Sequence, residues 1–344
     1  MFLRIKNRIE KELKNYSRNI DKVYSLNKLS PLLFNKIKEY ISRDGKRVRP
    51  ILFCIGYLGF TNKEPKGLYR SALSLELLHD FMLVHDDIID KSDTRRGKPS
   101  MHSLFNKYLK KKKVKFNGED LSIIVGDVIY ALALDAFLAV KEDPMRKELA
   151  LKKLISAALY TGSGEFIELL LGAKPIEKTT KTDIYKIYDY KTANYTFASP
   201  LSMGATLAGV KENELNRLVD YGMNLGRAFQ IKDDIIGIFG ETSQTGKSNL
   251  TDISEAKKTI LIWYAYRNTD SKGKTKIKNV FSGKKYGKKE LAEIRNLISN
   301  SGSLNYAKKE ISNLLNKSEE IIKSSEIKKE HRETLINFSR KLLS

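Results

Sequence analysis

The sequence predicts an all-α protein, and three observations support that class. Apolar residues recur at three- and four-residue spacing through most of the chain, convincing period-two stretches are absent, and all seven prolines fall by Pro200. The first pattern is typical of amphipathic helices, whereas exposed strands alternate. We find no repeat and no linker long enough to divide the chain, so we expect one domain over residues 1–344. Long helices with a few polar positions facing inward are typical of a bundle with a site in its core.

The helical periodicity is clearest over 67–90, 119–141, 145–171, 213–239 and 303–323. Gly118 and the segment GKSNLTD at 246–252 are expected to connect helices. The stretches SGSLNYAKKEISNLL and EHRETLINFSRKLL near the C-terminus are amphipathic too, and we expect them to pack or to face a second subunit.

Three Ser-Pro or Asp-Pro pairs predict where helices begin. Ser30, Asp143 and Ser199 each precede a proline. Serine and aspartate cap helix N-termini well, and proline is favoured at the first helical position. The sequence therefore predicts helix starts at all three pairs.

The composition narrows the function classes. A net charge of +22 favours nucleic acid, an anionic membrane surface or a phosphorylated substrate as partner, unless the lysines only reflect a lysine-rich genome. Residues 105–115, FNKYLKKKKVK, hold six lysines and no acid, but lack the aromatic interleaving of a nucleic-acid platform, so we expect a solvated connection. No uncharged apolar run of about 18 residues occurs, so no membrane span is expected. The single cysteine, Cys54, favours a cytoplasmic location.

The stretch LVHDDIIDKSDTRRGKP at 83–99 holds a first acidic group. On a helix Asp86 and Asp90 lie on one face, with Asp87 beside them and two isoleucines between. Carboxylates on a mostly apolar helix are costly to bury without a counter-ion. Oxygen ligands without nearby cysteine favour a hard cation, above all Mg²⁺, although a solvated acidic face would show the same letters.

A second acidic group strengthens the metal interpretation. FQIKDDIIGIFG at 229–240 repeats the pattern with Asp233 and Asp234, and Gln230 precedes them on the same face. Two such groups facing each other across a bundle, with Mg²⁺ between them, would clamp a substrate that bears a diphosphate.

Basic clusters complete the pattern. GKRVRP at 45–50 supplies Lys46, Arg47 and Arg49, and TRRGKP at 94–99 supplies Arg95 and Arg96. Arginine forks bind phosphate bidentately, and lysine adds a point charge. The stretch FGETSQTGKSN resembles a phosphate-binding P-loop, but five residues instead of four separate its glycines and no buried strand precedes it. We therefore expect two anion pockets, one reached through metal and one directly by cations.

At this point the motifs resemble a known family. DDIID with TRRGKP, FQIKDDIIG, GKRVRP, the GD of IIVGDVIYALA, KTA at 191–193 and GKSNLTDISEAKKT are similar, in this order, to the motifs of the trans-isoprenyl diphosphate synthases. The resemblance implies an all-α fold with the two aspartate motifs facing each other across a central cavity, a homodimer, and Mg²⁺ as cofactor. It implies condensation of isopentenyl diphosphate with the allylic dimethylallyl, geranyl or farnesyl diphosphates.

The resemblance also assigns residues. The Mg²⁺ ligands on the allylic side would be Asp86, Asp87 and Asp90, with Asp233 and Asp234 opposite. Isopentenyl diphosphate would be held by Lys46, Arg49, His79 and Arg96. The allylic diphosphate would contact Arg95, Lys191, Lys247 and Lys257, and the developing cation would lie near Thr192 and Gln230. His79 alone would be read as an ordinary core histidine.

Chain length is predicted from Phe81 and Met82. They lie five and four residues before Asp86, about one helical turn deeper, where the growing tail should pass. A phenylalanine there would act as a floor, and the resemblance favours geranylgeranyl diphosphate as product, with farnesyl diphosphate as the alternative. A core phenylalanine without this role would look the same. We expect at most transient contact with a membrane surface, when product leaves.

Some positions depart from the family pattern: Asp44, Glu165, Glu168 and Gly237 replace its usual residues, and SNLTD lacks a frequent glycine. Three other functions stay open. A terpene cyclase or head-to-head synthase also uses paired acidic motifs, a non-catalytic partner subunit should have lost aspartates, and a basic helical protein could bind nucleic acid.

Overall fold

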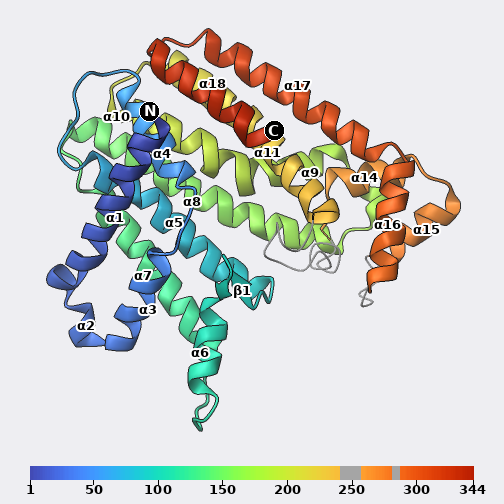
Figure 1. The fold of residues 1–344 in the computed structure, drawn as a ribbon, viewed down its shortest axis with the longest axis horizontal. Coiled ribbons are helices and arrows are strands. Elements are labelled where there is room, and N and C mark those ends of the chain that lie inside the picture. The colour runs from blue at the N-terminus through green and yellow to red at the C-terminus, as the bar shows by residue number, and fades with distance from the viewer. Residues whose placement is uncertain (241–256, 281–286) are drawn as a thin grey trace. The chain divides into compact units, whose positions relative to one another are not determined.

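The computed structural model describes residues 1–240, 257–280 and 287–344. Within them almost every ordered element is a helix, which confirms the all-α class (Figure 1). The chain packs into two compact units: unit 1 comprises Met1–Leu154 and Met203–Val210, and unit 2 comprises Ile155–Ser202 and Lys211–Ser344. A single domain over 1–344 stays a prediction. The connection predicted at 246–252 and the P-loop-like stretch after Gly240 lie outside the described residues.

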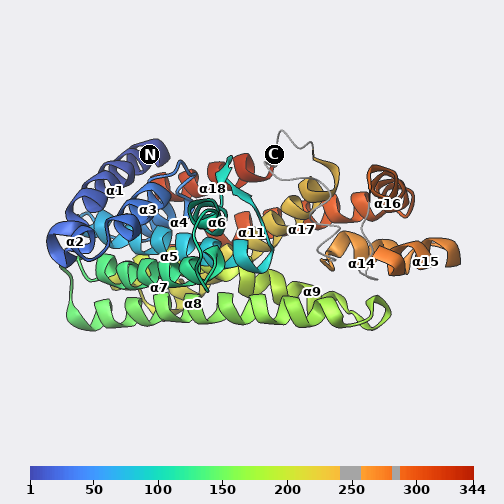
Figure 2. The ribbon, with the colours of Figure 1, turned by 90° about the horizontal axis from the view of Figure 1, so that it is seen from below.

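Unit 1 is built around α5, which packs against α1, α4 and α7 (Figures 1 and 2). Its elements are α1 (Phe2–Tyr24), α2 (Leu26–Leu29), α3 (Pro31–Ile41), α4 (Val48–Leu58), α5 (Leu68–Ile89), β1 (Thr94–Arg95), β2 (Lys98–Pro99), α6 (Met101–Leu109), α7 (Gly118–Phe137) and the first turns of α8 (Pro144–Ala173). Most residues of α5 between Leu68 and Asp80 are buried and many of them are apolar, so the buried acids Glu76 and Asp80 are unusual there.

Unit 2 is built around α11 (Glu212–Phe239), which packs against η2 (Tyr188–Ala198) and α17 (Ser303–Lys323). Its other elements are the rest of α8, η1 (Ile176–Lys178), α9 (Lys181–Ile187), the start of α10 (Ser199–Leu207), α14 (Ile260–Arg267), α15 (Ser271–Val280), α16 (Lys288–Asn300) and α18 (Lys329–Leu343). One apolar core joins α9, α11, α14 and α17, and α18 packs against α11 and α17. These contacts confirm the packing role predicted for the two C-terminal stretches.

The three predicted helix starts are confirmed, two of them together with their caps. The Ser30 hydroxyl accepts a hydrogen bond from the Leu33 N–H at 3.3 Å, and the Asp143 carboxylate accepts one from the Arg146 N–H at 3.0 Å. The third helix, α10, begins at Ser199, but the capping role predicted for Ser199 is wrong. Its N–H donates to the Asn194 carbonyl, five residues earlier, because the wide π-helical turns of η2 already run into this position.

One helix of the described residues is long and apolar enough, by length and composition alone, to cross a membrane: α8. Only 28% of its most apolar window is buried within the chain. Two acids, Glu165 and Glu168, lie in its C-terminal half. A helix of this kind does not establish a span, so the absence of one stays a prediction.

Candidate active site

A tight hairpin directly after α5 positions the Arg-Arg pair of the first motif. Arg95 pairs with Lys98, so Arg96 and Gly97 form a two-residue turn, and both have positive φ, 54° and 71°. Two successive left-handed residues are the signature of a type I′ turn, which matches the twist of a hairpin. The turn returns the chain toward the end of α5, so that Arg95 and Arg96 can both reach that helix.

Arg95 contacts the aspartates of the first motif directly. Its Nε donates to Asp87 Oδ1 at 2.7 Å, and its Nη2 donates to Asp86 Oδ2 at 3.0 Å. Asp87 is fully buried, so the ion pair sits where water screens it little. The predicted contact of Arg95 with the allylic diphosphate is untested.

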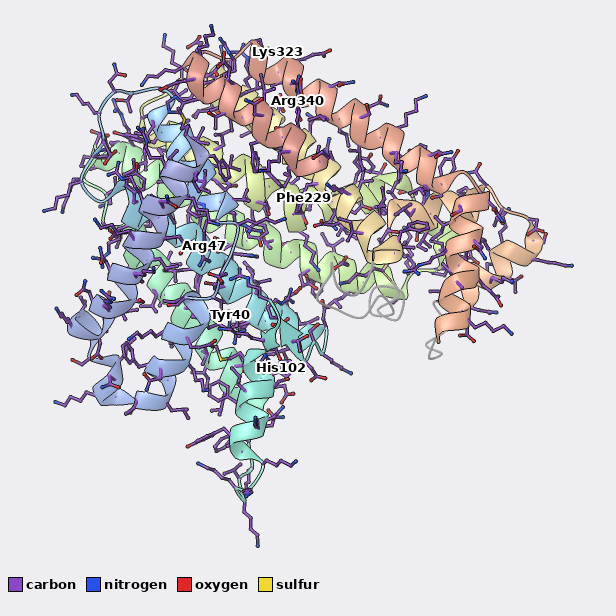
Figure 3. All side chains as sticks on the ribbon, in the orientation of Figure 1. Tyr40, Arg47, His102, Phe229, Lys323 and Arg340 are labelled. Atoms are coloured by element: carbon purple, nitrogen blue, oxygen red, sulfur yellow. The ribbon has the colours of Figure 1, made fainter. Side chains whose placement is uncertain are left out.

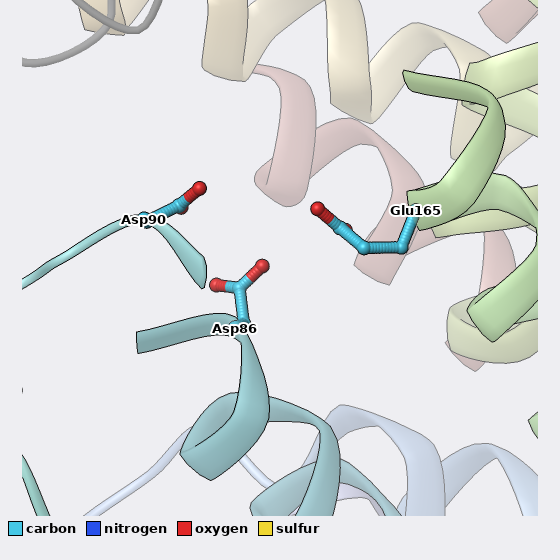
Figure 4. Close-up of side chains that lie close together, drawn as sticks. All are labelled: Asp86, Asp90 and Glu165. Carbon is cyan, nitrogen blue, oxygen red and sulfur yellow. The ribbon is translucent and has the colours of Figure 1, made fainter. Parts of the chain in front are cut away.

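Asp86 and Asp90 form an oxygen-only pair at the end of α5 (Figure 4). One carboxylate oxygen of each lies within 4.8 Å of the other. The Asp90 N–H donates to the Asp86 carbonyl at 2.8 Å, so the last helical turn fixes their spacing. A helix C-terminus carries partial negative charge, which makes these carboxylates unfavourable there without cations. The donor set therefore fits a hard divalent cation.

One cation of GKRVRP, Arg47, has a structural role. Arg47, labelled in Figure 3, is 2% exposed, and its guanidinium donates to Glu10 at 2.8 Å, to Glu76 at 2.7 Å and to the Arg43 carbonyl at 2.6 Å. Because its guanidinium is occupied by these three partners, Arg47 links α1 to α5.

Three of the residues predicted to hold isopentenyl diphosphate come together in unit 1. Burial, and then the positive charges of Arg49 and Arg96, lower the pKa of His79 well below its usual value, so its imidazole is neutral. Arg96 Nη2 lies 3.8 Å from Glu76 and 3.6 Å from Asp80. Lys46, the fourth, is exposed and lies close to Arg49 in the sequence.

The predicted length-determining residues lie against α7. The Phe81 ring is 4.7 Å from the His85 ring and 5.1 Å from the Tyr130 ring, centroid to centroid. Gly126 of α7 lets the helices approach, because a Cβ there would be 2.3 Å from His85 Nε2. Phe81 and Met82 are both partly exposed, as residues facing a cavity would be.

In unit 2 a chain of hydrogen bonds joins η2 to α11. Thr192 Oγ1 donates to Gln230 Oε1 at 2.6 Å, and Gln230 Nε2 donates to Asp234 Oδ1 at 3.0 Å. The hydroxyl of Tyr188 donates to the other Asp234 oxygen and accepts the Ile260 N–H at 3.0 Å. Both oxygens of Asp234 are therefore oriented by neighbours.

Glycine makes this contact between η2 and α11 possible. A Cβ on Gly226 would lie 2.4 Å from Ala193 Cα, closer than real Cβ contacts. The backbones can therefore approach until Thr192 and Gln230 meet.

Lys191 is held by two carboxylates of α8. Its Nζ lies 2.6 Å from Glu165 and 2.5 Å from Glu168. Both glutamates are departures from the family pattern, and together they position the ammonium group by charge-assisted contacts.

The two aspartates of the second motif differ in exposure: Asp233 is exposed and Asp234 is buried.

Two lysines lie just before α14. Lys258 is buried, donates to the Leu171 and Gly172 carbonyls at 2.7 Å each, and burial lowers its pKa to about 8. Lys257, which was predicted to contact diphosphate, is partly buried beside it. Lys247 lies outside the described residues.

Comparison with known proteins decides the family. The sequence profile of the polyprenyl synthetases matches residues 30–298. The chain belongs to the polyprenyl synthetase family. This membership confirms the predicted enzyme class, an isoprenyl diphosphate synthase.

Two relatives of this polyprenyl synthetase illustrate the similarity. A short chain isoprenyl diphosphate synthase of Methanocaldococcus jannaschii is 29% identical over 303 residues, which cover 88% of this chain and 83% of the relative. A geranylgeranyl diphosphate synthase of Sulfolobus acidocaldarius is 31% identical over 288 residues, covering 80% and 79%.

A solved structure shows the same fold. Geranylgeranyl pyrophosphate synthase from Corynebacterium glutamicum, complexed with isoprenyl diphosphate and magnesium, gives a TM-score of 0.90 at 24% identity, covering 99% of this chain and 98% of that one. At this identity the likeness supports the all-α fold.

Sequence reasoning missed several residues of this polyprenyl synthetase. No local sequence pattern points to Tyr188, because its hydrogen-bond partner Asp234 is 46 residues away. Glu76 and Asp80 did give one: two acids four residues apart in the apolar run LSLELLHDF are unusual and indicate a special environment.

The placement of the two aspartate motifs also stays a prediction in part. The first lies in unit 1 and the second in unit 2. That they face each other across a cavity is untested.

Proposed function

We propose that the chain is a Mg²⁺-dependent prenyltransferase that joins isopentenyl diphosphate to allylic diphosphates and releases a short-chain prenyl diphosphate. The observation that carries this proposal is that α5 and its hairpin hold two groups of side chains suited to binding a diphosphate. The first would bind it through a metal ion, and the second would bind it directly. The first is the carboxylate pair of Asp86 and Asp90, which suits a metal and has Asp87 next to it in the sequence. The other is the cationic cluster around His79.

The chain's own residues support each step. Arg95 and Lys191 would bind the allylic diphosphate, and Arg49, Arg96 and Lys46 the second diphosphate. When bound, Mg²⁺ would neutralise the charge that grows on the leaving diphosphate. Breaking the allylic C–O bond leaves a carbocation, and the double bond of isopentenyl diphosphate attacks it. The proton lost afterwards goes to an oxygen of the released diphosphate.

Thr192 and Gln230 would lie near that carbocation. Their oxygen dipoles are fixed by the hydrogen bonds to each other and to Asp234, so no reorganisation is needed when positive charge develops. An apolar cavity there would exclude water, which would otherwise quench the cation.

We further propose geranylgeranyl diphosphate as the main product, with Phe81 as the floor. Its ring is braced by His85 and Tyr130 and cannot easily turn aside. Relatives include geranylgeranyl synthases and a geranylfarnesyl diphosphate synthase of Aeropyrum pernix, 32% identical over 275 residues. Farnesyl diphosphate is the alternative product.

The test is incorporation of labelled isopentenyl diphosphate. The protein is incubated with dimethylallyl, geranyl or farnesyl diphosphate and Mg²⁺, with each component omitted in turn, and the products are sized. We expect incorporation only when an allylic primer, isopentenyl diphosphate and the divalent cation are all present. No incorporation with any primer contradicts the proposal.

A homodimer is also proposed, because the outer face of α8 is strongly apolar. In unit 2 Leu159 is 61% exposed, Phe166 is 63% exposed and Leu170 is 60% exposed. Apolar patches of this kind usually mark an interface. A second copy of the chain would cover them.

Charges on this face should break the dimer. The double variant Leu159→Glu with Phe166→Glu is expected to sediment as a monomer, because burying two carboxylates against an apolar face is costly. Analytical ultracentrifugation measures the mass. Asn313→Glu, an exposed position on α17, is the control and should stay dimeric. A wild-type monomer, or a double variant that remains a dimer, contradicts this interface.

Transient contact with an anionic membrane is proposed through the connection between α6 and α7. It carries five of the six lysines of 105–115, together with exposed Val114 and Phe116. Each lysine near an anionic surface contributes roughly 1 kcal/mol to binding. Binding to anionic vesicles should fall when Lys110 to Lys113 are changed to serine. Retained binding would contradict a role of this connection in membrane contact.

A cytoplasmic location, consistent with buried Cys54, is part of the proposal.

A further inference from the structure

The carboxyl group of Asp80 is buried in an unusual way. The residue is 1% exposed, and neither side-chain oxygen accepts a hydrogen bond from any group in the described part of the chain. A buried carboxylate without hydrogen bonds costs several kcal/mol, so natural proteins rarely keep one without a function. Asp80 lies immediately after His79, on the helix that ends at the first aspartate motif.

Asp80 shares one cation with a second carboxylate. Arg96 Nη2 lies 3.6 Å from Asp80 Oδ1 and 3.8 Å from Glu76 Oε1, beyond hydrogen-bonding distance of either. Glu76 is one helical turn before Asp80, and it is already bound by Arg47 at 2.7 Å. Arg96 is thus drawn toward the carboxyl pair but is not fixed there.

The other charged or titratable groups that face Asp80 come from α5 itself and from three further elements. They are Glu76 on α5 itself, Tyr40 on α3, Arg47 and Arg49 at the start of α4, and Arg96 in the hairpin. Burial is the largest influence and the Glu76 charge the next, and together they raise the pKa of Asp80 to about 8 against the opposing arginines. Burial also raises the pKa of Tyr40, so the phenol stays neutral.

We propose that Asp80 is a positioning residue that couples binding of the second diphosphate to uptake of one proton. With its proton, Asp80 is neutral and leaves the Arg96 guanidinium to the phosphate oxygens. Without it, the carboxylate holds Arg96 and repels the diphosphate. The inference rests on the proposed function, since Arg96 acts here as a ligand of isopentenyl diphosphate.

Linkage gives the sign of the effect. A diphosphate at Arg96 adds negative charge beside Asp80 and strengthens proton binding there, so protons must equally strengthen diphosphate binding. Affinity is unaffected well below pH 8, where Asp80 already holds its proton. It falls as the pH rises above 8, by at most about tenfold per pH unit for one proton.

The test measures binding of isopentenyl diphosphate alone to the intact protein by calorimetry, from pH 7.5 to 9.5. In this range the ligand's own phosphates are already ionised. We expect the wild-type Kd to rise at least about threefold across the range, below the one-proton limit. Repeating the titration in buffers of different ionisation enthalpy should show net proton uptake near pH 8.

Two variants separate this role from a structural one. Asp80→Asn has the same shape but cannot titrate, so its Kd should be nearly constant with pH. Asp44 is an exposed aspartate in the loop between α3 and α4, and Asp44→Asn should therefore show the same pH dependence as wild type. Arg96→Ala should bind weakly at every pH.

Stability offers a second measurement on the same variant. A raised folded-state pKa means that Asp80 favours folding most below its unfolded value, near 4, and that this contribution is lost as the pH rises through about 8. The melting temperature of Asp80→Asn should therefore gain on that of wild type between pH 5 and 8.

The outcomes are distinguishable. Binding by wild type with a Kd independent of pH and no proton uptake overturns the role of Asp80 and leaves the proposed function intact. Equal pH dependence in Asp80→Asn overturns it too. No binding of isopentenyl diphosphate at any pH contradicts the proposed function, and the role of Asp80 falls with it.

Discussion

Replacing Asp86 with asparagine will lower the rate of prenyl transfer by about a thousandfold or more. The change removes one negative charge and one strong metal-binding oxygen pair from the end of α5. It leaves Asp87 hydrogen-bonded to Arg95 at 2.7 Å, so the local fold should persist. A thousandfold loss corresponds to about 4 kcal/mol of transition-state stabilisation, within the range for charge stabilisation of a leaving group.

The measurement is kcat for incorporation of labelled isopentenyl diphosphate at saturating Mg²⁺. Asp93→Asn is the matched control, because Asp93 is exposed in the same segment and its carboxylate accepts a hydrogen bond from the Ser103 hydroxyl at 3.2 Å. It should retain nearly full activity. A kcat for Asp86→Asn within tenfold of wild type would show that this carboxylate does not hold the metal.

Replacing Phe81 with alanine will lengthen the main product by at least one isoprene unit. The substitution removes a ring packed on His85 and Tyr130, about one turn before Asp86, and opens space along α5. A growing chain then meets no floor at this depth. The fold should tolerate the change, because Phe81 is only partly buried and part of the lost volume would be filled by solvent or product.

Chromatographic sizing of the products after long incubation checks this expectation. Phe60→Ala, the same change at a partly buried position outside α5, should leave the product length as in wild type. An unchanged product from Phe81→Ala would assign the floor to another residue, Met82 being the next to test.

The helices could be predicted from the sequence because their signals are local. The periodic ranges around α5, α7 and α11 agree with the structure within a few residues, and Ser30 caps its helix as the pattern indicates. The capping role predicted for Ser199 failed for a physical reason, although α10 does begin there. The Ser-Pro pair does match the pattern of a helix N-cap. The Ser199 N–H, however, already donates to the Asn194 carbonyl of η2, and no local sequence pattern reveals a π-helical segment.

The candidate site was predictable where its partners are close in sequence. Arg95 follows Asp86 by nine residues, and the hairpin turn formed by Arg96 and Gly97 comes directly after it. The contact of Thr192 with Gln230 spans 38 residues and depends on how closely α11 approaches η2. That distance is set by tertiary packing, so only the resemblance brought these two residues together before the structure did.

Stoichiometry tests the central claim most directly. Inorganic pyrophosphate released and labelled isoprene units incorporated are counted in one reaction with farnesyl diphosphate, isopentenyl diphosphate and Mg²⁺. Prenyl transfer predicts one pyrophosphate for each unit added, and none when isopentenyl diphosphate is left out. Release without isopentenyl diphosphate, as a terpene cyclase or a head-to-head synthase would give, or release without incorporation, would contradict the account.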